Sequence, residues 1–304
     1  MSTSSLVESR PIRGEFSALD LLTATYTLCS AAVLLVRSMI VDQRVTGTSL
    51  PWLLVAHLLL LILVVLARKA RNEAAPGLSL LAEWYPLVVL MAVYGSIGLL
   101  NGPLQHLNAS LDPVVIGWEA KLRGPQLLDR WAGHPGPSYV NWILGFSYLA
   151  FFPMVIAAPL VLWLQGKHEH ARRAIFGISL TFLTCYLIFL LFPVAGPSYL
   201  IGWPDTQTSA DLPVRLVRSL NERGDSWGSA FPSSHVAGSA TALGLGMLGC
   251  KKLGTMLMPI AIGILLAVIY FRVHYVLDAV AGLAMAALSI TIVRRFWPLD
   301  TPIT

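Results

Sequence analysis

AIFGISLTFLTCYLIFLLFP, residues 174–193, is a run of twenty residues that contains no charged side chain. A helix of about twenty apolar residues spans the hydrocarbon core of a bilayer. Only 12% of the 304 residues are charged, whereas about a quarter are charged in an average soluble domain. Comparable apolar blocks occur at 18–41, 50–67, 79–100, 139–165, 235–250, 256–271 and 275–293. The sequence therefore predicts an all-α protein, a polytopic membrane helical bundle with about eight transmembrane helices.

One block and two connections differ from the rest. The block at 235–250 is short and rich in Gly, Ala and Ser. Small residues allow close contact between helices in a membrane, so we expect this helix in the interior of the bundle. The long connections are 101–138 and 194–234. Within the first of them, the stretch 112–131 predicts a helix at the membrane interface.

The distribution of Lys and Arg predicts the orientation of the chain. The net charge is +5, but the basic residues lie in short connections and form no long run, so we expect no nucleic-acid partner. Cytoplasmic loops are enriched in Lys and Arg, which favours both termini in the cytoplasm. The connection 194–234 and the turn before 275–293 then lie together on the outer, non-cytoplasmic face. We expect an integral protein of the bacterial inner (plasma) membrane.

A histidine and an aspartate stand four residues apart in FRVHYVLDAVAG, residues 271–282. His274 and Asp278 lie about one turn apart on one helix face, where the carboxylate can accept the imidazole N–H and fix its tautomer. Arg272 adds a permanent cation nearby. Ionisable residues at membrane depth are costly and mark functional sites. The alternative is a His–Asp pair that only joins two helices.

A second polar cluster opens the stretch AFPSSHVAGSATALG, residues 230–244. Pro232 followed by two serines predicts a helix start, with Ser233 or Ser234 as the N-cap. His235 then lies in the first turn. The N–H groups and the positive dipole end of a helix N-terminus bind phosphate. The alternative is ordinary capping, with a histidine at the water interface.

The two clusters together suggest phosphoryl-transfer chemistry without a metal or another cofactor. His274 would attack phosphorus as a nucleophile. Asp278 would orient its imidazole, and His235 would protonate the departing alkoxide. A zinc site built from these three residues is the main alternative, but the sequence lacks the H-E-x-x-H spacing of many zinc enzymes.

Three further residues are predicted to bind the phosphate. The Arg272 side chain and the backbone amides near Ser233 and Ser234 would stabilise the negative charge that builds on the phosphoryl oxygens. A permanent cation at Arg272 would also repel a zinc ion. We therefore predict no metal ligands in this chain.

These motifs resemble the type-2 phosphatidic acid phosphatase superfamily. PSSH, residues 232–235, resembles the second signature of that family, and RVHYVLDAVAG, residues 272–282, resembles the His-x-x-x-Asp core of the third. The resemblance covers the chain from about residue 79 onward. It implies a six-helix lipid phosphatase or phosphotransferase core over residues 79–304, preceded by a tail and two extra helices over residues 1–78.

The resemblance also implies a mechanism. It gives His274 as the nucleophile that forms a phosphohistidine, Asp278 as its partner and His235 as the acid. FPVAGPSYL, residues 192–200, stands where the family has its first signature, but it contains neither the lysine nor the arginine of that signature. Candidates for the missing cations are Lys121, Arg123, Arg215, Arg218 and Arg223.

The pattern FPxxGPxY together with RxHYxxD is more similar to the branch that includes inositol phosphorylceramide synthases. We expect an integral membrane enzyme that acts on a lipid or isoprenoid phosphate at the outer face. If the acceptor is water, the enzyme is a phosphatase. If it is a hydroxyl of a head group or a lipid, the enzyme is a transferase similar to that branch. A third alternative is a non-enzymatic lipid transporter that retains the polar cluster.

Two polar residues lie within predicted spans but outside these motifs. Arg37 stands near the end of the first block, and we expect its side chain to extend to the interface. His57 stands in the second block and is predicted to form a hydrogen bond inside the bundle. GKHEHARR, residues 166–173, is interpreted as a cytoplasmic connection and not as a metal site.

Overall fold

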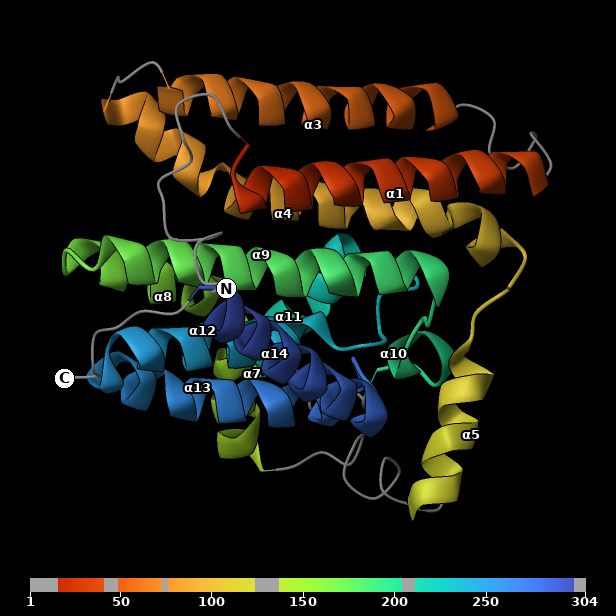
Figure 1. Cartoon of the computed structure of the whole chain (residues 1–304). Helices are drawn as coiled ribbons and strands as arrows, with labels where there is room; N and C mark the ends of the chain where they lie inside the picture. The colour runs from red at the N-terminus through yellow and green to blue at the C-terminus, as the bar shows by residue number, and fades with distance from the viewer. Residues whose placement is uncertain (1–15, 41–48, 73–75, 124–136, 204–210, 298–304) are drawn as a thin grey trace.

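The computed structural model describes residues 16–40, 49–72, 76–123, 137–203 and 211–297. These residues form helices and no strand, which confirms the all-α prediction for the part of the chain that is described (Figure 1). The helices are α1 (Ala18–Ile40), α3 (Ser49–Asn72), α4 (Pro76–His106), α5 (Asp112–Arg123), α7 (Ser138–Leu149), α8 (Phe151–Leu164), α9 (His168–Leu191), α10 (Pro197–Leu200), α11 (Leu212–Gly224), α12 (Ser234–Gly249), α13 (Lys251–Tyr270) and α14 (Val276–Phe296).

The predicted apolar blocks correspond to helices of the bundle. Six of the described helices are long and apolar enough to cross a membrane: α1, α3, α4, α9, α13 and α14. The pair α7 and α8, bent by 50°, is a seventh candidate span. The remaining block is α12, whose 16 residues are fewer than the twenty or so that span a bilayer. The interfacial helix predicted at 112–131 is present as α5 up to Arg123, and its remainder lies outside the described residues.

Helix α12 lies inside the bundle, as its small residues predict. It packs against α8, α9, α13 and α14, and ten of its sixteen residues are buried. A Cβ atom at Gly238 would lie 2.5 Å from the Phe182 ring, and one at Gly249 would lie 2.6 Å from Leu162. Glycine at these positions therefore permits the close approach of α9 and α8.

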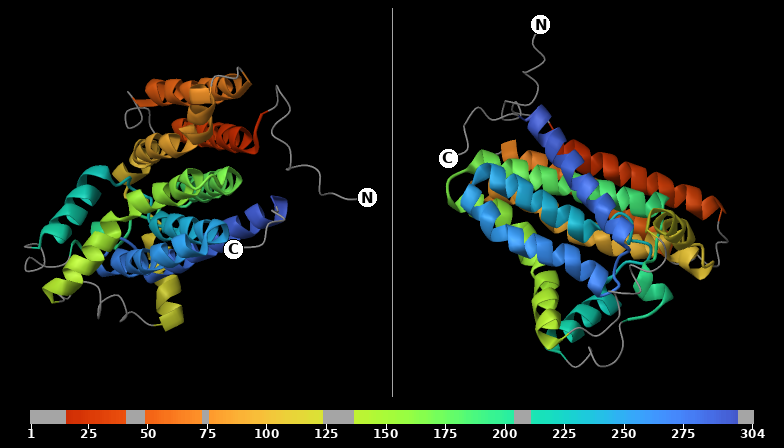
Figure 2. Two further views of the ribbon diagram at one scale, coloured as in Figure 1. Left: turned by 90° about the vertical axis from the view of Figure 1, so that its left-hand side faces the viewer. Right: turned by 90° about the horizontal axis from the view of Figure 1, so that it is seen from below.

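The N-terminal helices form a separate side of the bundle. Figure 2 shows α1 and α3 next to α4, on one side of α9. Only 22% of the spanning part of α3 is buried, compared with 67% of that of α9. Because large apolar side chains such as Trp52 and Leu58 of α3 are exposed, this helix presents a lipid-facing surface.

Buried polar contacts join α1 to its neighbours. Asp20 is fully buried and accepts hydrogen bonds from Tyr85 of α4, at 3.0 Å, and from Arg71 of α3. The Ser30 hydroxyl lies 2.9 Å from His57 Nε2, which confirms the hydrogen-bonded role predicted for this histidine. Lipid tails are as apolar as the side chains of a membrane helix, so apolar packing alone gives little preference for one helix neighbour over lipid. These contacts therefore specify which faces of α1, α3 and α4 meet.

The prediction that Arg37 extends to the interface is wrong. Its guanidinium donates to the carbonyl oxygen of Leu100 at 2.8 Å, to Asn101 Oδ1 at 2.6 Å and to the carbonyl oxygen of Leu190. Carbonyl groups in the last turn of a helix have no intrahelical donor, so Leu190 at the end of α9 provides a partner inside the protein. Asn101 also donates to the carbonyl oxygen of Trp227 at 3.2 Å, which connects α1 to the segment before α12.

Replacing Arg37 tests this connection. Arg37→Met removes the donor for buried acceptors, and each acceptor left unpaired costs about 1–3 kcal/mol. We expect the unfolding temperature in detergent to fall by at least ~3 °C. Arg218→Met is the control, because Arg218 lies on the exposed face of α11 and, within the described part of the chain, pairs with exposed Glu222. Equal unfolding temperatures for the two variants would contradict the role of Arg37.

Candidate active site

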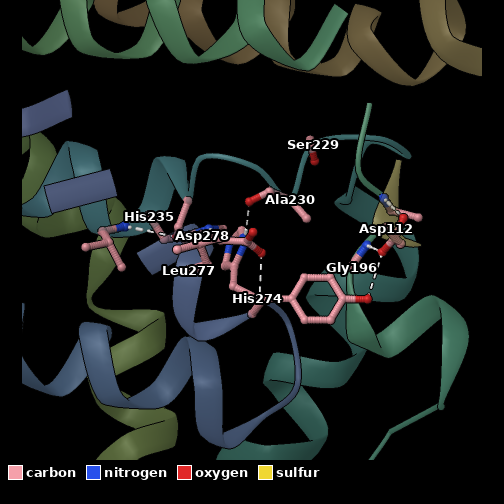
Figure 3. A network of polar contacts seen from close by, with 12 residues as sticks. Asp112, Gly196, Ser229, Ala230, His235, His274, Leu277 and Asp278 are labelled. Carbon is pink, nitrogen blue, oxygen red and sulfur yellow. Dashed lines mark hydrogen bonds and ion pairs between the residues drawn. The ribbon is translucent and has the colours of Figure 1, made fainter. Parts of the chain in front are cut away.

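The starts of α12 and α14 meet at one end of the bundle. The backbone N–H of Ser233 donates to the carbonyl oxygen of Asp278 at 2.9 Å. A Cβ atom at Gly282 would lie 2.6 Å from the Ser233 carbonyl oxygen, so a larger residue at 282 would separate the helices. The two polar clusters of the sequence therefore lie side by side (Figure 3).

Ser233 caps α12. Its hydroxyl accepts a hydrogen bond from the Val236 N–H at 3.4 Å, which confirms the predicted helix start and selects Ser233 as the N-cap. Ser233 and Ser234 are both buried. The Ser233 amide is engaged by Asp278, so the phosphate-binding role of these two serines stays a prediction.

The imidazole of His274 is held by a backbone carbonyl group. Its Nδ1 lies 2.8 Å from the carbonyl oxygen of Ala230. A carbonyl oxygen can only accept, so Nδ1 carries the proton and Nε2 carries the lone pair. That Nε2 lies 3.5 Å from Nδ1 of His235. The two histidines predicted from separate motifs thus face each other.

Asp278 differs from its expected arrangement. Its Oδ2 lies 3.6 Å from His274 Nδ1, which is longer than a hydrogen bond. The same oxygen accepts the Tyr275 N–H at 2.8 Å and so caps α14. The imidazole N–H points to the nearer Ala230 carbonyl group. Asp278 therefore acts on His274 through its charge and through the turn that it stabilises.

His235 is packed between two aromatic rings. Its ring centroid lies 4.9 Å from that of Tyr148, in a stacked arrangement, and 4.5 Å from that of Phe151. The two rings hold the plane of the imidazole, while burial and the neighbouring His274 lower the pKa of His235 to about 3. A general acid needs the protonated form, so a bound anion would have to raise this pKa.

His235 and His274 line one small pocket. Its other described lining residues are Tyr94, Ala195, Asp225, Ser229, Ala230 and Val273. Arg272 is not among them. It is half-buried, with a backbone φ of 57°, and its N–H donates to the Ile269 carbonyl oxygen at 3.0 Å where α13 ends. Its role in phosphate binding stays a prediction.

Four of the five proposed substitutes for the missing cations have described side chains, and none of these four lines the pocket. Arg215, Arg218 and Arg223 are exposed on α11, and Lys121 is exposed on α5. The side chain of Arg123 lies outside the described residues. In the described part of the chain, no three His, Cys, Asp or Glu residues gather as metal ligands would.

Asp225 lines the pocket and was missed by the sequence analysis. Its Oδ1 accepts hydrogen bonds from the Tyr94 hydroxyl at 2.5 Å and the Ser229 hydroxyl at 3.3 Å. Burial raises the pKa of the Asp225 carboxyl, and the hydrogen bonds from Tyr94 and Ser229 offset part of this rise. The available signal was an acidic residue ten positions before His235, in a connection expected on the same face.

Asp112 was also missed, although it holds two segments next to the pocket. This fully buried carboxylate accepts the N–H groups of Ala195 and Gly196, at 2.7 and 2.8 Å, and the Tyr275 hydroxyl at 2.9 Å. Gly196 has a φ of 98°, a conformation that glycine adopts readily. The available signal was the Asp-Pro pair at the start of the predicted interfacial helix.

A second carboxylate of α5 holds the start of α14. Glu119 accepts the Leu277 N–H at 2.7 Å, and burial raises the pKa of its carboxyl. The adjacent Trp118 stacks on Phe192, with ring centroids 5.7 Å apart. Helix α5 therefore contacts both the segment after α9 and the segment that carries His274.

Asp112→Asn tests whether the buried carboxylate holds these segments. Three donors converge on Asp112. In the asparagine variant the NH₂ group, itself a donor, would face one of them, and that hydrogen bond would be lost. Hydrogen bonds to charged groups contribute about 1.5–3 kcal/mol each, so we expect a clear fall in the unfolding temperature. Asp211→Asn is the control: Asp211 also accepts hydrogen bonds, from Ser138 and Asn141, but at an exposed position that water can reach. An equal effect of both substitutions would refute the structural role of Asp112.

The chain was compared with models of protein families. A family model described as the PAP2 superfamily matches residues 124–292. The matched range contains α7 to α13 and most of α14, and with them His235, His274 and Asp278. No curated protein and no solved structure matches the chain.

Proposed function

The chain belongs to the PAP2 superfamily, whose members are phosphatases or phosphotransferases, and we propose that it transfers the phosphoryl group of a lipid or isoprenoid phosphate through a phosphohistidine. The observation that carries this proposal is the 3.5 Å approach of His274 Nε2 to His235 Nδ1 in one pocket. Such a pair supplies a nucleophile and an acid for one phosphorus atom.

His274 is the proposed nucleophile. The Ala230 carbonyl group places the proton on Nδ1 and leaves the lone pair of Nε2 directed into the pocket. Nε2 forms a bond to phosphorus as the ester P–O bond breaks. The imidazole becomes positively charged in this step, and the carboxylate of Asp278, 3.6 Å from Nδ1, stabilises that charge.

His235 is the proposed acid for the leaving oxygen. The negative charge of a bound phosphate would favour its imidazolium form, which burial and His274 otherwise disfavour, and the rings of Tyr148 and Phe151 hold its plane. A separation of 3.5 Å leaves no room for a phosphorus atom between the two nitrogens, so substrate binding must widen it. Because Ala230 fixes His274, we expect His235 to move along the faces of the two rings.

Further positive potential comes from helix α12. Its N-terminus carries roughly half a unit of positive charge, and His235 lies in its first turn. This supports the predicted contribution of the Ser233 and Ser234 segment to phosphate binding. Arg272, two residues before His274, remains the predicted cation of the site.

The distribution of charge along the bundle supports a site on the outer face. Helix α9 ends next to the segment that lines the pocket, and it begins at the opposite end of the bundle. Basic residues gather at the starts of α9 and α13 and at the end of α14. They are Lys167, Arg172, Arg173, Lys251, Lys252, Arg294 and Arg295. Positive charge concentrates on the cytoplasmic side of membrane proteins, which would leave the pocket on the other side.

Head-group transfer is a second candidate, favoured by the burial of the nucleophile. His274 is only 3% exposed, and Ala195, Ala230 and Val273 line the pocket beside it. A site that excludes water protects a phosphohistidine from hydrolysis and favours an alcohol acceptor. Purified protein, incubated with a panel of lipid phosphates and alcohol acceptors, distinguishes the candidates by mass spectrometry: hydrolysis gives free phosphate, and transfer gives a new phosphoester.

His274→Ala tests the nucleophile. Loss of the atom that forms the covalent bond should lower the turnover of lipid phosphates at least ~10³-fold, and the variant should remain folded. His168→Ala, at an exposed histidine at the start of α9, should keep full activity. Wild-type turnover by His274→Ala would refute the mechanism. If the wild type releases and transfers no phosphate, and the wild type and His274→Ala move lipid equally well, the protein is a transporter.

His235→Ala tests the acid through the choice of leaving group. A general acid contributes about 10²- to 10⁴-fold, and it matters most when the leaving oxygen is strongly basic. We expect a large loss of activity on an alkyl lipid phosphate and a much smaller loss on p-nitrophenyl phosphate, whose leaving group needs no proton. Equal losses on the two substrates would show that His235 is not the acid.

A further inference from the structure

The pocket has an acidic side that the mechanism above does not use. Asp225, in the turn after α11, is the one acidic residue among the described residues that line it. The hydroxyl groups of Tyr94 and Ser229 both donate to its Oδ1 and lie 3.1 Å from each other. The two histidines and this carboxylate thus share one small space.

The turn that carries Asp225 is firmly positioned. The Ser226 hydroxyl donates to the Tyr94 carbonyl oxygen at 2.7 Å, and the Ser226 N–H donates to the Tyr94 hydroxyl at 3.3 Å. At the other end of the turn, the Ala230 N–H donates to the Val194 carbonyl oxygen at 2.9 Å. The same short turn therefore positions both Asp225 and the carbonyl group that orients His274.

A carboxylate in this pocket is poorly suited to bind phosphate. Two charges of the same sign at close range repel each other strongly at the effective dielectric constant of a protein surface. A fixed carboxylate beside a nucleophile is well suited to another task, which is to accept a proton from a hydroxyl group. The raised pKa of Asp225 makes it a stronger base than an exposed aspartate.

We propose that Asp225 is the general base of the second half-reaction and takes the proton of the acceptor hydroxyl group, whether that group belongs to water or to an alcohol. This inference rests on the phosphohistidine mechanism proposed above. The acceptor oxygen forms a bond to phosphorus, and the bond from phosphorus to His274 Nε2 breaks, returning its electron pair to the nitrogen. The acceptor proton goes to Asp225. It then passes to His235, which gave up a proton in the first half-reaction.

Asp225→Asn separates the two half-reactions. The asparagine oxygen still accepts the hydrogen bonds from Tyr94 and Ser229, but the side chain cannot take up a proton. With p-nitrophenyl phosphate as the probe, we expect a burst of one p-nitrophenol per protein at the wild-type rate. Steady-state turnover should then be at least ~100-fold slower, and alkali-stable phosphohistidine should accumulate. Glu222→Gln is the matched control, because it removes an exposed carboxylate three residues away and should resemble the wild type in both phases.

Adding methanol as a second acceptor tests whether the base serves any hydroxyl group. Free phosphate and methyl phosphate should both form slowly in Asp225→Asn, and Asp225→Glu should recover part of the lost rate. The role of Asp225 would be overturned if Asp225→Asn left the burst and the steady-state rate unchanged. It would also be overturned if the substitution slowed both equally. A loss confined to one acceptor would overturn it as well. A wild type that forms no phosphohistidine would instead refute the proposed function itself.

Discussion

The hydrogen bond between the His274 imidazole and the Ala230 carbonyl group is the contact on which the arrangement of the site depends. It joins segments 44 residues apart. A backbone carbonyl oxygen does not titrate and has no rotamers, so the proton stays on Nδ1 and the lone pair of Nε2 stays directed at the pocket. The position of Ala230 is fixed in turn by its N–H, which donates to Val194 at 2.9 Å. The chemistry of the imidazole thus depends on how two connections are held.

Most of the acidic side chains near the site bind backbone amides. Asp112 accepts the amides of Ala195 and Gly196, Glu119 accepts that of Leu277, and Asp278 accepts that of Tyr275. Buried N–H groups need partners, and in these connections no helix or sheet supplies them. Asp225 differs, because it also accepts hydrogen bonds from two hydroxyl groups and lines the pocket. The other three carboxylates hold the site, whereas Asp225 is the one that we propose takes part in the reaction.

The features that were predicted from the sequence depend on local patterns. The apolar blocks, the interior position of α12 and the cap at Ser233 follow from composition and spacing over a few turns. The four-residue spacing of His274 and Asp278 correctly places them near each other, at 3.6 Å. It cannot reveal that a carbonyl group from another segment lies closer. The sequence around Arg37 is compatible both with an interfacial side chain and with a buried one. It cannot reveal the acceptor at the end of α9, which is 153 residues away.

The parts of the chain that precede the family match take part in holding the site. The match begins at residue 124, yet α5 ends at Arg123 and its carboxylates hold the segments on either side of the pocket. Arg37 of α1 binds Asn101, and Asn101 binds the Trp227 carbonyl oxygen in the turn that carries Asp225. Because a polar contact inside a bilayer has no water to replace it, loss of α1 would leave Asn101, which holds that turn, without its Arg37 donor. The N-terminal helices are therefore a structural support of the pocket as well as an anchor in the membrane.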